Sequence, residues 1–207
     1  MSAIFLNSAC RDASELIVPK NAKLSNAFYG CSSLISAPRK LSDNIIHDNQ
    51  YTNMFHICSS LVEAPELPAT TLTASCYSSM FNGCTSLVKA PVLPATSLVA
   101  SCYEYMFYDC SSLVEAPELP ATTLASSCFN SMFSRCTSLL KAPVLPATTL
   151  EASCYSSMFY DCSSLVEAPE LPATTLTASC YKYMFRGCSS LVEAPVLPAT
   201  KLAAYCY

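Results

Sequence analysis

One unit of the chain reads Cys58-Ser59-Ser60-Leu61-Val62-Glu63-Ala64-Pro65-Glu66-Leu67-Pro68-Ala69-Thr70-Thr71-Leu72-Thr73-Ala74-Ser75-Cys76-Tyr77-Ser78-Ser79-Met80-Phe81-Asn82-Gly83. The pattern starts again every 26 residues, at Cys84, Cys110, Cys136, Cys162 and Cys188. A fixed period of roughly 20 to 50 residues is typical of a solenoid, because each unit must stack on its neighbours to bury its apolar side. The repeat therefore predicts a stack of coils with one unit in each coil.

The first half of each unit predicts a short parallel strand. Leu61, Ala64, Leu67 and Leu72 recur in every regular unit and are expected to line one continuous interior. Pro65 and Pro68 recur as well, and proline cannot donate a hydrogen bond to a β-ladder. We therefore expect a strand of about three to five residues that ends at the prolines.

The second half of each unit predicts one or two helical turns. Leu72, Cys76 and Met80 lie four residues apart in a stretch without glycine or proline, and Cys84 closes the unit. The expected fold is an α/β repeat solenoid with 26-residue coils. Short parallel β-strands would lie on one side, and short helices or turns on the opposite side.

The two ends of the chain depart from the repeat. The unit from Cys31 to Cys58 has 27 residues, and an Arg39-Lys40-Leu41-Ser42-Asp43-Asn44 segment replaces its proline turn. We predict an N-terminal cap and irregular first unit over residues 1–30, followed by one solenoid domain over 31–207. The chain stops at Tyr207, midway through a unit, so we expect further repeats beyond it or end-to-end stacking on another copy.

Two sequence boxes resemble those of the BspA-like leucine-rich repeat family of bacterial surface proteins. These are Cys-Ser-Ser-Leu-Val-Glu-Ala-Pro-Glu-Leu-Pro, from Cys58, and Cys-Tyr-x-x-Met-Phe-x-x-Cys, from Cys76. The resemblance covers roughly residues 26–207. It implies a leucine-rich-repeat solenoid with parallel strands, a role in binding or adhesion, and a place at the cell surface or outside the cell. It carries over no catalytic residue.

Charged residues alternate in sign at one position of the repeat. In order they are Glu63, Lys89, Glu115, Lys141, Glu167 and Glu193. Equivalent residues of a parallel ladder lie about 4.8 Å apart, so the first five should form a row of alternating charge. Three residues further on, Glu66 alternates with Val92 along the array, which indicates growth by copying two-coil blocks. The charge row is either a solvated structural row or a contact surface.

Other exposed candidates come from positions that vary between coils. The tyrosines and arginines among them are typical of protein contacts. They are Tyr105, Tyr108, Arg135, Tyr160, Tyr183 and Arg186. Surface drift explains the same variation. Two rows of threonine, starting at Thr70 and Thr71, raise the further hypothesis of an ice-binding surface, although adjacent residues beside a proline turn should face different ways.

The chain has fourteen cysteines, which allow several interpretations. Cys76 and Cys84 flank the expected helical segment, too far apart for a disulfide within the unit. Their spacing, without a nearby histidine, is a poor zinc pattern, and the repeat places no cation beside a thiol for redox chemistry. We therefore interpret most cysteines as small buried side chains that fill the core.

Composition argues against several other functions. The chain has 52% hydrophobic residues, 13% charged residues and a formal charge of −4, with no apolar run long enough to span a bilayer. Lysine and arginine are scattered, so nucleic acid is not an expected partner. The N-terminus lacks the basic region of a secretory signal.

No catalytic or cofactor site is expected. The only histidines are His47 and His56, in the irregular first coils, and three glycines cannot build a phosphate-binding loop. We expect a non-enzymatic scaffold without a metal or cofactor that binds a protein or glycan. The alternative is a structural spacer without a specific ligand.

Overall fold

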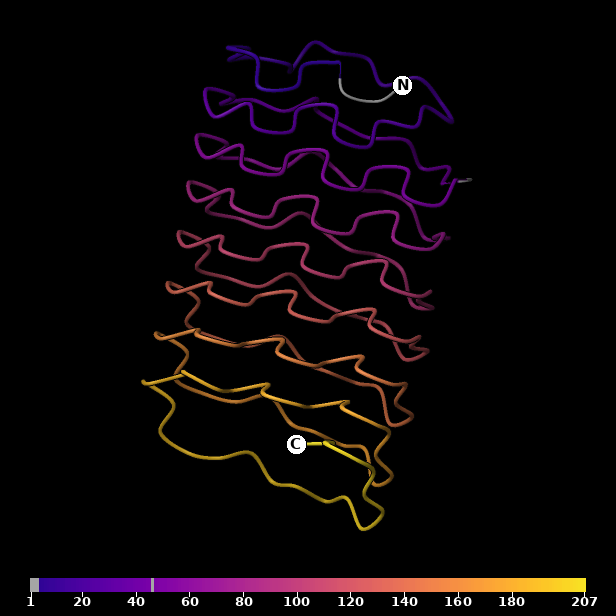
Figure 1. The fold of residues 1–207 in the computed structure, drawn as a ribbon, viewed down its shortest axis with the longest axis vertical. Coiled ribbons are helices and arrows are strands. Elements are labelled where there is room, and N and C mark those ends of the chain that lie inside the picture. The colour runs from indigo at the N-terminus through magenta and orange to yellow at the C-terminus, as the bar shows by residue number, and fades with distance from the viewer. Residues whose placement is uncertain (1–3, 46) are drawn as a thin grey trace.

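A computed structural model describes residues 4–45 and 47–207 as a stack of flat coils. The coils follow one another along the long axis, and the two ends of the chain lie at opposite ends of the stack (Figure 1). Each coil has two parts. We call residues 61–72 and their equivalents the proline segment, and residues 73–84 and their equivalents the turn segment. The 26-residue solenoid is thus confirmed, while the first three residues of the expected cap lie outside the described part.

The turn segment is a run of overlapping β-turns, so of the expected helices or turns only the turns are present in the described part of the chain. In the coil from Thr73 to Cys84, every second amide donates to the carbonyl three residues earlier, with N···O distances of 3.0–3.3 Å. The amides between them donate to the next coil at 2.8–3.1 Å, as Tyr77 does to Cys102. Five bonds of this second kind join consecutive regular coils. No helix is found in residues 4–45 and 47–207.

The four-residue spacing that suggested a helix has a different cause. Ser75, Ser79 and Gly83 all have φ between 53 and 74°, so the backbone enters the left-handed region once every four residues. A residue with positive φ ends each tight turn and sets up the next one. Leu72, Cys76 and Met80 therefore face the interior at the period of the turns and not at the period of an α-helix.

The proline segment is extended but makes only single β-bridges. Glu63 pairs in parallel with Lys89, and the same position pairs from coil to coil along the stack. The described residues contain no continuous strand. Pro65 and Pro68 lack the amide hydrogens that a longer ladder requires, so the expected strand is reduced to isolated bridges, one or two between neighbouring coils. Leu61, Leu67 and Leu72 are buried as expected, and Ala64 is half-buried.

Two columns of stacked aromatic rings fill the interior. Neighbouring rings of the first column are 4.8–5.9 Å apart between centroids; it contains Phe5, Phe28, Phe55, Phe81, Phe107, Phe133, Phe159 and Phe185. The second has spacings of 5.5–6.2 Å; it contains Tyr51, Tyr77, Tyr103, Phe129, Tyr155, Tyr181 and Tyr207. Both columns continue across nearly all coils, so the stack has one core rather than a core for each coil.

Buried thiols connect the first aromatic column from coil to coil. The Cys84 thiol donates to the Phe55 carbonyl of the preceding coil, with Sγ···O at 3.1 Å. The same carbonyl accepts the Cys58 amide at 3.0 Å. The contact recurs at Cys110, Cys136, Cys162 and Cys188. These cysteines are therefore small core residues that also satisfy a second lone pair of a buried carbonyl.

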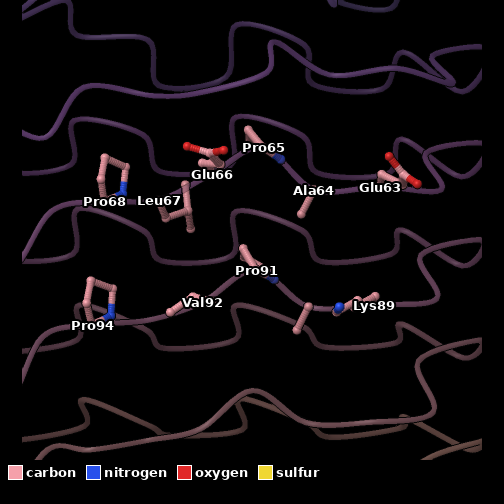
Figure 2. Close-up of a pocket in the computed structure, with 11 residues that line it drawn as sticks. Glu63, Ala64, Pro65, Glu66, Leu67, Pro68, Lys89, Pro91, Val92 and Pro94 are labelled. Atoms are coloured by element: carbon pink, nitrogen blue, oxygen red, sulfur yellow. The ribbon is translucent and has the colours of Figure 1, made fainter.

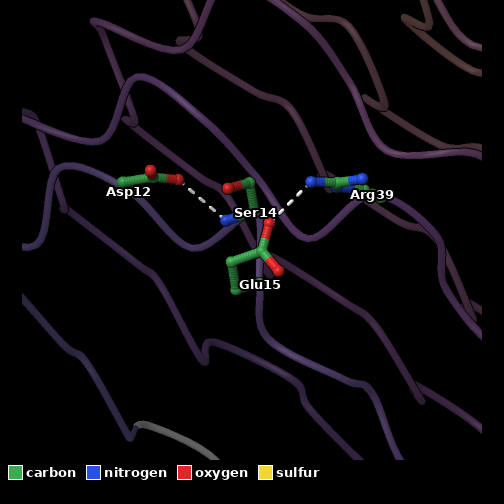
Figure 3. A network of polar contacts seen from close by, with 4 residues as sticks. All are labelled: Asp12, Ser14, Glu15 and Arg39. Carbon is green, nitrogen blue, oxygen red and sulfur yellow. Dashed lines mark hydrogen bonds and ion pairs between the residues drawn. The ribbon is translucent and has the colours of Figure 1, made fainter.

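The irregular first coil stacks on the repeat by the same means. Phe5 lies against Phe28 at 4.8 Å between ring centroids, and the Asn7 amide donates to Tyr29. An exposed ion pair joins Arg39 to Glu15 at 2.6 Å, beside the Asp12 carboxylate that accepts the Ser14 amide (Figure 3). The boundary expected near residue 30 stays a prediction.

Candidate binding surfaces

The proline segments place the predicted charge row on one exposed face of the stack. Parallel bridges join Glu63 to Lys89, and the row continues through Glu115, Lys141 and Glu167. All five side chains are exposed. At the end of the row Glu167 pairs with Glu193, so two like charges lie side by side there. The alternating row expected from the repeat is therefore present in the fold, and its use in binding stays a prediction.

The charges of this row are not engaged with one another. In the described part of the chain the one ion pair within 4 Å is Arg39 with Glu15, in the irregular first coil. Neighbouring exposed charges also contribute little to stability, typically about 0 to 1 kcal/mol for each pair. The row therefore leaves its carboxylates and ammonium groups available to a partner.

Exposed valines form a second row on the same face, which we call the valine–glutamate row. It consists of Glu66, Val92, Glu118, Val144, Glu170 and Val196. The three valines are 76%, 78% and 82% exposed, whereas the apolar residues at the position of Val62 are 36–53% exposed from Val62 to Val166. In Figure 2, Glu66 and Val92 lie between the stacked pair Pro65 and Pro91 and the stacked pair Pro68 and Pro94.

The alternation of glutamate and valine at position 66 and its equivalents indicates duplication of two-coil blocks, but the sequence alone does not show that the valines are exposed. Val92 lies between Pro91 and Pro94, where the adjacent Leu93 already supplies the buried side chain and leaves Val92 and its equivalents no room in the core.

Grooves separate neighbouring proline segments. The largest, about 590 Å³, lies between coils 63–68 and 89–94 and is lined by Ala64, Leu67 and Val92 among others. Smaller grooves of about 260 and 150 Å³ occupy equivalent places between coils 168–172 and 195–198, and between coils 89–92 and 115–118. Because prolines interrupt the bonding between coils here, the backbones do not close the gap. The face is therefore ridged, with a groove between successive ridges.

The turn segments bring the predicted aromatic and arginine residues into two clusters. In the first, the rings of Tyr105 and Tyr108 meet edge to face at 5.8 Å between centroids. Tyr108, as a hydrogen-bond partner, raises the pKa of Arg135, and nearby Asp109 raises it further. In this cluster residues from two coils lie side by side.

The second cluster lies further along the stack. The Arg186 guanidinium lies over the rings of Tyr160 and Tyr183, 5.6 and 5.5 Å from their centroids. The Lys182 ammonium lies 5.0 Å from the Tyr183 centroid. Such contacts hold a cation over an aromatic face. All six candidates of the turn segments thus fall into two groups, which the sequence did not pair.

Both threonine rows are exposed, and the expectation that adjacent residues face different ways stays a prediction. Thr70 and Thr71 are both exposed, and so are their equivalents. Ser97 and Lys201 interrupt the second row. An ice-binding role stays untested.

The cysteines are free, and burial makes most of them poor nucleophiles. Twelve of the fourteen are buried, as expected for core residues. Burial raises the pKa of Cys58, Cys76 and Cys128 to about 12, and that of Cys188 to about 11. The reactive thiolate is therefore strongly disfavoured at neutral pH.

The two histidines form no joint site. His56 stacks on Tyr29 at 4.7 Å between ring centroids, and its burial lowers its pKa. Among residues 4–45 and 47–207, no three His, Cys, Asp or Glu side chains come together as metal ligands would.

The comparisons with known proteins identify the repeat. Six copies of the BspA type leucine rich repeat region match residues 6–114 and 120–202. The chain belongs to the BspA-type leucine-rich repeat family. A solved leucine-rich repeat protein of T. pallidum is similar over 79% of this chain and 69% of its own, with 19% identity and a TM-score of 0.46. No curated protein matches the chain.

The BspA-type family is generally non-catalytic, and membership generally implies a binding role. No helix in the described residues is long and apolar enough to cross a membrane.

Proposed function

We propose that this protein is a non-enzymatic scaffold that binds a partner through the face of its proline segments. The observation that carries the proposal is the exposure of Val92, Val144 and Val196, each more than three quarters open to solvent. The fold of a coil does not require these exposed valines, because the leucines already fill the core. Regularly placed apolar groups between charged ones are typical of a contact surface.

A protein partner fits this face better than a glycan. Isolated valine side chains gain free energy when they are covered by other apolar groups. Sugars are bound chiefly by aromatic rings and hydrogen-bonding groups, which the valine–glutamate row lacks apart from its carboxylates. The two clusters of the turn segments carry tyrosine and arginine and are proposed as a second contact surface. We would expect a glycan at these two clusters rather than on the face of the proline segments.

The absence of enzymatic activity is proposed on the chemistry of the residues. The abundant nucleophile of the chain is cysteine, and its thiols lie in the core with raised pKa values. The exposed faces carry carboxylates, ammonium groups and tyrosines in repeating positions. These groups can hold a partner along the stack.

The proposal can be tested by inverting the charge row. We would change Glu63 and Glu115 to lysine and Lys89 and Lys141 to glutamate, which leaves the net charge of −4 unchanged. Wild type and variant would be applied to protein and glycan arrays. We expect the protein ligands of the wild type to be lost. Circular dichroism and the thermal midpoint are the controls for folding.

A spacer gives the opposite result. If the wild type binds no array component, or if the folded variant keeps every ligand, the face does not bind and the repeat serves only to set length. A second variant, with Val92, Val144 and Val196 changed to serine, separates the apolar from the charged contribution.

A further inference from the structure

We propose that the valine–glutamate row binds an extended peptide that carries a basic side chain at every third residue. The inference rests on the proposed function and assigns the chemical class of the ligand. It is carried by the charge of the face, by the spacing of its glutamates, and by its prolines.

The face is the acidic side of the molecule. Together the charge row with Glu193 and the valine–glutamate row contain seven glutamates and two lysines, a formal charge of −5. The whole chain has a formal charge of −4, so the rest of the molecule is close to neutral. The acidic charge therefore lies where the valines are exposed, and it attracts a basic partner to this face.

The spacing of the acidic groups sets the spacing of the basic ones. Glu66, Glu118 and Glu170 are separated by two coils, and the coils are joined by parallel bridges. The nearest bridges, at Glu63 and its equivalents, hold neighbouring coils about 4.8 Å apart three residues from this row, so successive glutamates are about 9.6 Å apart. Three residues of a polyproline II chain advance about 9.3 Å, and three residues of a strand about 9.9 Å. A peptide that runs along the stack thus meets one glutamate with every third side chain.

The valines and the lysines fix where the ligand can lie. Val92 and Val144 lie halfway between glutamates, where they can contact the uncharged residues of each triplet. Lys89 and Lys141 lie on the same coils as these valines and repel a basic side chain placed there. A peptide shifted by one coil would therefore meet both a lysine and a valine in place of a glutamate.

The prolines favour an extended ligand that needs no backbone partner. Rows beginning at Pro65 and Pro68 flank the glutamates and valines and offer no amide hydrogen. A β-strand added to this face would leave much of its own backbone unpaired. A polyproline II chain keeps its backbone solvated and presents its side chains at a three-residue period, so side chains carry the recognition.

The probe is a fluorescent peptide of four Lys-Pro-Pro triplets, tested by fluorescence anisotropy against the whole chain. A matched peptide has the same composition with its four lysines consecutive. We expect the triplet peptide to bind about tenfold more tightly than the clustered peptide and to weaken as salt is added. Equal affinity for the two peptides would mean unspecific attraction to negative charge and would overturn the inference.

A pair of variants locates the site. The first changes Glu66, Glu118 and Glu170 to glutamine. The second removes three exposed or half-exposed acids of the turn segments that lie outside the two clusters, Asp48, Glu104 and Glu151, by amide substitution, so the net charge changes equally. We expect the first variant to lose about tenfold in affinity for the triplet peptide and the second to stay within about twofold. Equal losses would place the binding elsewhere.

The result is separable from that of the array experiment. The triplet peptide could fail to bind while the charge-row inversion still abolishes binding of an array ligand. In that case the inferred ligand class is wrong and the proposed function stands. If neither peptide binding nor array binding changes when this face is altered, the proposed function and the inferred ligand class are both wrong.

Discussion

At the scale of single residues, the turn segment depends on backbone conformations that most side chains avoid. Positive φ recurs at Ser75, Ser79 and Gly83, and at equivalent positions the chain carries Asp109 and Arg135. A non-glycine residue in this region costs about 1–2 kcal/mol, which is least for aspartate and asparagine. The bonds between coils hold these positions in place, because every second amide of the segment donates to the next coil.

Substitution of Gly83 measures this conformational cost directly. Its φ is +74°, and an added Cβ would lie 3.4 Å from Cγ1 of Ile57, which is ordinary contact. We expect Gly83→Ala to lower the free energy of unfolding by about 1 kcal/mol, measured by urea denaturation. Gly83→Asn is the matched control and should lose less than half as much. Equal losses would mean that steric contact, and not backbone conformation, decides the position.

At the scale of elements, the second aromatic column carries buried hydroxyls. The hydroxyls of Tyr77 and Tyr155 have no hydrogen-bond partner among the described residues. The column accepts phenylalanine at Phe129, which is also buried. Burial raises the pKa of both tyrosines, so the hydroxyls stay protonated. The column is held by ring stacking, and its hydroxyls are a cost to it.

Removing such a hydroxyl should therefore stabilise the protein. We expect Tyr155→Phe to raise the free energy of unfolding by about 1 kcal/mol, because an unpaired buried polar group is lost. The control is Tyr205, which is exposed. Tyr205→Phe should change the free energy of unfolding by less than about 0.5 kcal/mol. Destabilisation by Tyr155→Phe would show that the hydroxyl has a partner in solution, such as a buried water.

At the scale of the whole molecule, the buried thiols couple stability to pH. Folding raises the pKa of Cys58, Cys76 and Cys128 from 9 to about 12. Above pH 9 the unfolded chain loses these protons while the folded chain keeps them, so stability falls as pH rises toward 12. The contribution is fully present below pH 9. Burial acts in the same direction at the other core cysteines.

We expect the free energy of unfolding in reducing buffer to be nearly constant from about pH 6 to 8 and to fall steeply above about pH 9. Each fully responding cysteine contributes about 1.4 kcal/mol per pH unit. Urea denaturation at several pH values measures the slope. Changing Cys110, Cys136 and Cys162 to alanine should make the slope shallower, and an unchanged slope would assign the effect to the tyrosines.

The repeat predicted much of this molecule before its structure was known. It placed Leu61, Leu67 and Leu72 and most of the cysteines in the core, and it placed Glu63 beside Lys89 on the surface. In a solenoid, residues at the same position of successive units must stack. Periodicity alone therefore determines which residues become neighbours between coils.

The path of the backbone within a coil was beyond that reasoning. A four-residue apolar spacing fits both a helix and a run of turns, and only the bonds from Tyr77 and its equivalents to the next coil select the turns. The two tyrosine and arginine clusters and the exposure of Val92 likewise appeared only in the tertiary structure. Their physical reason is the same: contacts between different repeat positions depend on how the chain bends inside a coil, and the period carries no information about that bend.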